Sequence, residues 1–87
     1  MQVQKKDGRL EEFDRNKLKQ SILAAGANEN EAESITVQLE SWAPSMAINN
    51  AVHSQVVRAK TIELLKITNP VAVKTYEEYR KEAGSAT

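Results

Sequence analysis

The chain contains no cysteine and a single histidine, His53, among its 87 residues. Without cysteine there is no disulfide, no thiolate metal ligand and no thiol nucleophile, and one imidazole is too few for a zinc cluster. No apolar run approaches the roughly 20 residues that a membrane-spanning helix needs, and the N-terminal residues lack the apolar segment of an export signal. We therefore expect a cytoplasmic protein without a membrane segment.

Glycine is also scarce, with three residues, and Gly8 does not belong to a glycine-rich phosphate loop of the Walker type. Ser54 lies next to His53, but Ser54 is better explained as a helix cap. The chain offers no further group that would complete a nucleophile, a base and an orienting residue. The sequence therefore predicts that the protein is not an enzyme, and that it does not hydrolyse a nucleotide that it binds.

Charge is balanced overall, with 12 basic and 12 acidic residues in one small domain, but it is unevenly distributed. Residues 1–20 carry six basic and four acidic side chains, whereas residues 27–42 carry four acidic and no basic ones. Nucleic-acid-binding domains usually have a net basic charge and a broad basic stripe. The local excess of positive charge favours a small anionic ligand over a polynucleotide.

The first basic cluster coincides with a predicted β-hairpin. Asp7-Gly8 favours a two-residue type I′ turn, in which both central residues have positive φ, and extended segments at residues 2–6 and 9–13 flank it. Asp14 follows at the position of an N-cap, before a helix predicted from residue 15 to residue 25.

The start of this helix is a candidate phosphate site. A helix N-terminus presents unpaired N–H donors and a partial positive charge, and Lys5, Lys6 and Lys17 add full charges beside it. The simpler interpretation is a solvated hairpin whose lysines only improve solubility.

Apolar spacing predicts three further amphipathic helices, at residues 29–42, 54–68 and from residue 70 onward. Their predicted boundaries rest on local signals: Gly26 in the left-handed conformation, a capping box of Asn28 with Glu31, Pro44 as a stop, Ser54 as an N-cap, and Asn69 as a cap before Pro70.

Two features of the middle of the chain are less regular. Trp42 continues the core face of its helix, so packing in the core is favoured over stacking on a ligand. Residues 48–52 are the only candidate for a third strand, and Asn49-Asn50 weakens it. Residues 1–82 are predicted to form one domain, and residues 83–87 a frayed tail or a linker.

The N-terminal pattern resembles the opening signature of the ATP-cone domain. The matching residues are Val3, Lys5, Lys6, Asp7, Gly8, Arg9, Glu11, Phe13, Asp14 and Lys17. Residues 21–27, Asn69-Pro70 and residues 76–80 are similar to later parts of the family pattern, so the resemblance covers about residues 3–81. ATP-cones are regulatory nucleotide-binding domains of many ribonucleotide reductases, of the repressor of reductase genes and of some archaeal kinases.

The resemblance implies a fold and a site. The expected fold is α+β and mostly helical: a four-helix bundle capped by a lid, either a small β-hairpin or a three-stranded sheet. Lys5, Lys6 and Lys17 match phosphate contacts, Glu11 and Asp14 match base recognition, and Val3 and Phe13 match apolar residues of the pocket. The third helix contributes either Ser54 with Arg58 or, one residue earlier, His53 with Val57. The first register is preferred because it places a polar pair on one helix face.

Two functions compete at this point. The resemblance implies a regulatory domain that binds ATP or dATP together with Mg²⁺. Such a domain controls a larger enzyme or repressor, in cis or in trans, and changes oligomeric state with the bound nucleotide. The alternative is a small helical interaction module whose basic hairpin contacts a protein or a nucleic acid. The sequence leaves open the choice between ATP and dATP, the number of nucleotides bound and the parent protein.

Overall fold

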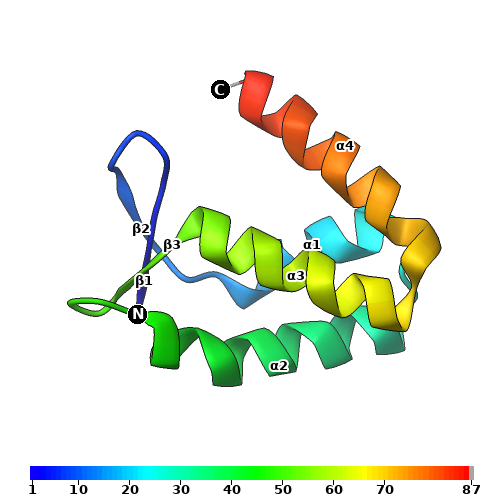
Figure 1. Ribbon diagram of the computed structural model, residues 1–87, viewed down its shortest axis with the longest axis horizontal. Helices are drawn as coiled ribbons and strands as arrows, with labels where there is room; N and C mark the ends of the chain where they lie inside the picture. The colour runs from blue at the N-terminus through cyan, green and yellow to red at the C-terminus, as the bar shows by residue number, and fades with distance from the viewer. Residues whose placement is uncertain (87) are drawn as a thin grey trace.

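Four helices and a three-stranded sheet make up the structure, a computed structural model that describes the backbone of residues 1–86 and the side chains of residues 1–78 (Figure 1). The elements are β1 (Gln2–Gln4), β2 (Leu10–Glu12), α1 (Arg15–Ala24), α2 (Glu29–Met46), β3 (Ala51–His53), α3 (Ser54–Thr68) and α4 (Pro70–Ala86). The predicted α+β, mostly helical class is confirmed, and the lid is a three-stranded sheet.

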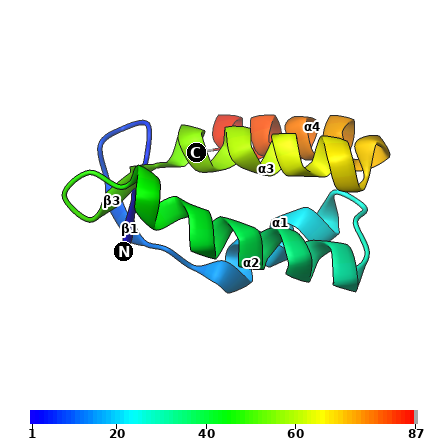
Figure 2. The same ribbon diagram turned by 60° about the horizontal axis from the view of Figure 1, so that its bottom comes forward.

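The helices form two layers with the sheet at one end. Figure 2 shows α1 and α2 in one layer, α3 and α4 in the other, and the strands beside the start of α3. β1 is the central strand, with β2 antiparallel to it on one side and β3 parallel to it on the other. The parallel pair needs a long crossover, which α1 and α2 provide.

The predicted caps of the first two helices are present. The Asp14 carboxylate accepts hydrogen bonds from the backbone N–H groups of Asn16 and Lys17, at 3.0 and 3.2 Å. Asn28 and Glu31 form the reciprocal capping box at the start of α2. Gly26 has φ of 111°, the left-handed conformation that ends α1 without a steric penalty. These signals act between neighbouring residues, so the sequence is enough to identify them.

The prediction that Pro44 ends the second helix is wrong, because α2 continues to Met46. Proline removes one N–H donor, but Ala43 beside it is fully buried against the sheet, which keeps this last turn packed. The Ser45 hydroxyl also donates to the Trp42 carbonyl at 2.6 Å. Tertiary packing therefore outweighs the local signal.

The prediction of a two-residue type I′ turn at Asp7-Gly8 is also wrong. In the first hairpin Lys5 accepts from the Gly8 N–H at 2.9 Å and donates to the Arg9 carbonyl at 2.8 Å, so the loop has three residues and only Gly8 among them has positive φ. This is the three-residue hairpin in which a type I turn precedes a left-handed residue.

Asn49 and Asn50 form the two-residue turn instead. Both have positive φ, 54° and 63°, and Ile48 and Ala51 exchange backbone hydrogen bonds on either side. The asparagine pair thus turns the chain into β3, which begins later than the predicted strand at residues 48–52. Asparagine tolerates the left-handed region better than most residues, which is the property that makes this turn possible.

The N-cap of α3 differs from the prediction. His53, not Ser54, is the N-cap of α3, without a side-chain cap hydrogen bond, and Ser54 is the first helical residue. Asn69 ends α3, and its amide donates to Glu31 at 3.1 Å. Pro70 begins α4 as predicted.

Two apolar clusters hold the layers together. The larger one joins all four helices, and its largest members are Tyr76, Ile22, Ile35, Leu39 and Leu65. The smaller one lies under the sheet and contains Ala43, Val52 and Val57. Trp42 packs against both clusters, as predicted for a core residue, and does not line the cavity described below.

The division of the chain at residue 82 remains a prediction. The backbone of α4 runs to Ala86, and Thr87 lies outside the described residues. Within residues 1–86, no helix is both long enough and apolar enough to cross a membrane.

Candidate functional site

A cavity of about 1140 Å³ opens between the hairpin, α1, α3 and α4. The hairpin supplies Val3, Lys5, Glu11 and Glu12, and α1 supplies residues 15–18, 20 and 21. Ser54, Val57 and Arg58 come from α3, and Tyr76 comes from α4. Small-molecule pockets have volumes of roughly 300 to 1000 Å³, so the cavity has room for a ligand as large as a nucleoside triphosphate.

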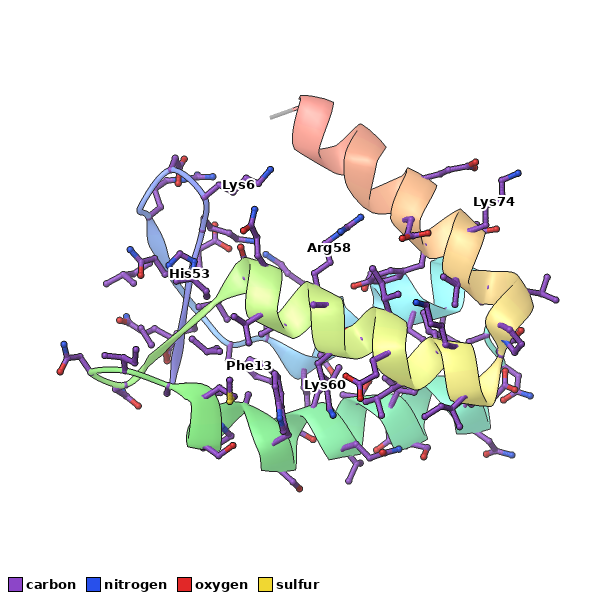
Figure 3. The ribbon with its side chains drawn as sticks, in the orientation of Figure 1. Lys6, Phe13, His53, Arg58, Lys60 and Lys74 are labelled. Carbon is purple, nitrogen blue, oxygen red and sulfur yellow. The ribbon has the colours of Figure 1, made fainter. Side chains whose placement is uncertain are left out.

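Eight of the nine predicted site residues lie together in this cavity. They are Val3, Lys5, Glu11, Phe13, Asp14, Lys17, Ser54 and Arg58. The ninth, Lys6, is exposed in the hairpin loop and does not line the cavity. Figure 3 shows the Lys6 side chain pointing from the hairpin toward the side of the molecule on which Arg58 projects.

The two registers predicted for α3 lead to different surroundings. Ser54 is 8% exposed and lines the cavity with Arg58, one helical turn later. His53 is exposed and does not line it, while Val57 lines it as an apolar residue of the cluster under the sheet. The polar pair that faces the cavity is therefore Ser54 with Arg58.

Both basic and acidic side chains line the cavity. Lys5 Nζ is 3.7 Å from Glu11 Oε1, so two of the predicted site residues are partners of each other in the free chain. Lys17 and Arg58 have no carboxylate within 4.0 Å among the side chains that the structure describes. These two residues are the basic groups most available to an anion.

The start of α1 is less suited to phosphate than the sequence suggested. Asp14 occupies the N–H groups of Asn16 and Lys17, and its carboxylate adds a negative charge at that helix end. At the start of α3 the His53 cap forms no side-chain hydrogen bond, and the buried Ser54 lines the cavity. The first turn of α3 therefore offers the better combination of donors and helix dipole.

The sequence reasoning missed seven residues of the cavity wall: Glu12, Arg15, Asn16, Leu18, Gln20, Ser21 and Tyr76. Gln20 and Ser21 follow Lys17 by three and four residues on α1, so the helical spacing from Lys17 would have identified them. Tyr76 is 2% exposed, belongs to the larger core cluster and reaches the cavity from α4. Its position depends on how α4 crosses α1 and α3, for which the sequence holds no local signal.

An ion-pair network lies behind this wall, between α1 and α2. Arg15 bonds to Glu33 and Glu40, and Lys19 bonds to Glu29 and Glu33. Hydrogen bonds to Glu40 and then Glu33 raise the pKa of Arg15, and those from Lys19 and then Arg15 lower the pKa of Glu33. The stabilisation from Glu33 is present at neutral pH and is lost only as the pH falls through its lowered pKa.

No group of three or more histidine, aspartate or glutamate side chains in the described part of the chain is arranged to hold a metal ion. The arrangement is instead that of a binding site. Two basic groups without described carboxylate partners, three carboxylates, the buried Ser54 and the apolar Val3 and Phe13 line one cavity. Such a site can hold an anionic ligand that also has an apolar or aromatic part.

The fold and the cavity thus define a small ligand-binding domain in which a sheet covers one end of a helical bundle. A family model described as the ATP cone domain matches residues 1–84, and the chain belongs to this family. ATP cones are regulatory nucleotide-binding domains. A comparison with curated proteins finds no match to the chain.

Proposed function

We propose that the cavity binds ATP or dATP and that the domain passes the state of this site to a larger protein. The observation that carries the proposal is that six predicted site residues from positions 3–17 line one cavity together with Ser54 and Arg58 of α3, which lie far from them in the sequence. Membership of the ATP cone family supports an adenine nucleotide as the ligand.

The distribution of charged side chains around the cavity indicates where the phosphates and the base of the nucleotide lie. Lys17, Arg58 and the start of α3 at Ser54 attract the phosphates, because they combine positive charge with hydroxyl and backbone donors. The base lies nearer the hairpin, where Phe13 and Val3 offer apolar contact. There Glu11 or Asp14 accepts a hydrogen bond from the exocyclic amine of adenine, which guanine does not have at that edge.

Lys5 and Lys6 bind phosphate in this proposal only after the hairpin changes. The ion pair between Lys5 and Glu11 breaks, so that Glu11 is free to accept a hydrogen bond from the base. Lys6 moves from its exposed position toward the cavity. The three short strands and the exposed β2 allow this movement at small cost. The hairpin is therefore the part of the domain that closes over the ligand.

Mg²⁺ arrives with the triphosphate in this proposal, coordinated by phosphate oxygens and water, as is common for this ion. The domain binds the nucleotide without hydrolysing it and is not an enzyme. Its partner is a larger enzyme or repressor, in cis or in trans, and nucleotide-dependent association is the means of control. The proposal places the domain in the cytoplasm, where its ligand is found.

Titration calorimetry tests the proposal with ATP, dATP and GTP in the presence of Mg²⁺. We expect micromolar dissociation constants for ATP and dATP, about −8 kcal/mol, and much weaker binding of GTP. Equal affinity for GTP would contradict adenine recognition by the hairpin. No binding of ATP or dATP at millimolar concentration would contradict the nucleotide site itself and favour an interaction module.

A further inference from the structure

Arg15 differs from the other basic residues of the cavity wall. Its Nη2 is 2.8 Å from Glu33 Oε2, and its Nε is 3.0 Å from Glu40 Oε1. Both glutamates lie on α2, and neither lines the cavity. The guanidinium is therefore directed away from a ligand and onto the neighbouring helix.

These contacts belong to a clamp between α1 and α2. The α1–α2 clamp consists of Arg15, Lys19, Glu29, Glu33 and Glu40. Its basic residues are four positions apart on α1, and its acidic residues are four and seven positions apart on α2, so each set lies on one helix face. The clamp therefore fixes how α1 is rotated about its own axis.

The other anchors of the first turn of α1 are the Asp14 cap and Leu18, which is partly buried against both apolar clusters. The helix has ten residues, and its only fully buried one is Ile22, near the far end. A helix of this length is marginal without tertiary contacts. Asp14 and Lys17 belong to this weakly anchored end, on either side of Arg15, and both line the cavity.

We infer that Arg15 is a positioning residue for nucleotide binding: it holds the first turn of α1 against α2 and thereby aims Lys17 at the phosphates. This inference rests on the function proposed above. It assigns Arg15 no contact with the ligand, although the residue lines the cavity. The alternative is that Arg15 binds phosphate itself and that Glu33 and Glu40 compete with the ligand for it.

The two roles predict opposite effects when the glutamates are removed. If Arg15 positions α1, Glu33→Ala or Glu40→Ala loosens the first turn and weakens ATP binding. If Arg15 binds phosphate, the same substitutions release it and strengthen ATP binding. Alanine is a good helix former, so neither change disturbs α2 through its backbone preference. Glu63→Ala removes the same charge from an ion pair on α3 outside the cavity and is the matched control.

ATP and adenosine are titrated against the parent chain and the three glutamate variants, and circular dichroism and a thermal melt confirm that each variant is folded at the titration temperature. We expect ATP to bind about three- to fivefold more weakly to the Glu33 and Glu40 variants, the range for half-exposed ion pairs of up to about 1 kcal/mol. Adenosine binding, and both ligands with Glu63→Ala, are expected to change little.

A second series separates positioning from simple stabilisation. Arg15→Met is expected to weaken ATP binding, and Arg15→Lys, which keeps a charge for one glutamate, to lie between Arg15→Met and the parent. If Glu33→Ala and Glu40→Ala lower the melting temperature but leave the affinity for ATP unchanged or raise it, the inference is wrong. If the parent chain binds no ATP, the proposed function fails and the inference fails with it.

Discussion

Lys17 and Arg58 face the cavity from different helices, and neither has a described carboxylate partner within 4.0 Å. Their shared position favours a phosphate site over the solvated surface that lysines often form. Both side chains line the same cavity as the buried Ser54, although Lys17 is itself exposed to solvent. At the scale of single residues, the case for an anionic ligand therefore depends on these two charges.

We predict that Lys17→Ala and Arg58→Ala each weaken the binding of ATP by about 1 to 3 kcal/mol, the range for hydrogen bonds to charged groups. Adenosine binding changes far less, because it has no phosphate for these charges to contact. Calorimetry of both ligands measures the difference. Lys66→Ala is the control, since Lys66 is exposed on α3 outside the cavity. Variants that fold and bind ATP as the parent does would show that the charges are only solvated.

At the scale of elements, the turn that leads into β3 carries the clearest backbone constraint. Asn50 has φ of 63°, and its carbonyl accepts a hydrogen bond from Gln2 N–H at 2.9 Å, so the turn also joins β3 to β1. A residue without a preference for positive φ would strain this connection.

We predict that Asn50→Gly stabilises the domain by about 0.5 kcal/mol, because glycine is favoured at the second position of a type I′ turn. Asn50→Ala should destabilise it by about 1 kcal/mol through the left-handed conformation. Urea unfolding of the two variants and the parent gives the order. Equal stability of the glycine and alanine variants would mean that the turn does not limit the stability of the sheet.

The elements also show where the sequence is informative. The Asp14 cap, the Asn28 capping box and the buried faces of the helices depend on near neighbours and on helical spacing, and they were predictable. The extension of α2 past Pro44 depends on packing against the sheet, and it was not.

The same distinction holds at the site. The predicted site residues were identified by their match to a family pattern, and eight of the nine meet in the cavity: six from residues 3–17, and Ser54 and Arg58 from α3. Tyr76 was missed because its place depends on the crossing of α4. Lys6 was placed by pattern at the phosphates, but a three-residue hairpin loop carries it outside the cavity wall. Its role therefore depends on a movement that a sequence pattern does not specify.

At the scale of the whole molecule, the sheet and the bundle differ in how they are held. The helices share the larger core, with fully buried Ile35, Leu39 and Leu65. The sheet has strands of three residues each, β2 is exposed along its length, and the cluster beneath it is small. Short strands with little burial open more readily than packed helices, so the hairpin should be the least stable part of the domain.

We predict that ATP slows amide exchange in residues 2–12 and 51–53, while exchange in the middle of α2 changes little. A ligand that contacts Lys5 on the hairpin and Ser54 or Arg58 on α3 links the sheet to the bundle. The ligand can shift the equilibrium between the open and the closed hairpin only because its affinities for the two states differ. The hairpin must therefore open measurably in the free domain. Exchange measured by mass spectrometry without ligand, with adenosine and with ATP gives the comparison.

Adenosine distinguishes the effect of the base from the effect of the phosphates, because it fills the base region without bridging to α3. If the link runs through the phosphates, adenosine protects the hairpin less than ATP does at equal occupancy, and only ATP changes the sedimentation coefficient of the chain. Strong protection of the hairpin without ligand, unchanged by ATP and with no change in sedimentation, would mean that the site binds its nucleotide without a switch. The movement of Lys6 toward the cavity would then be excluded as well, since it requires the hairpin to open and close.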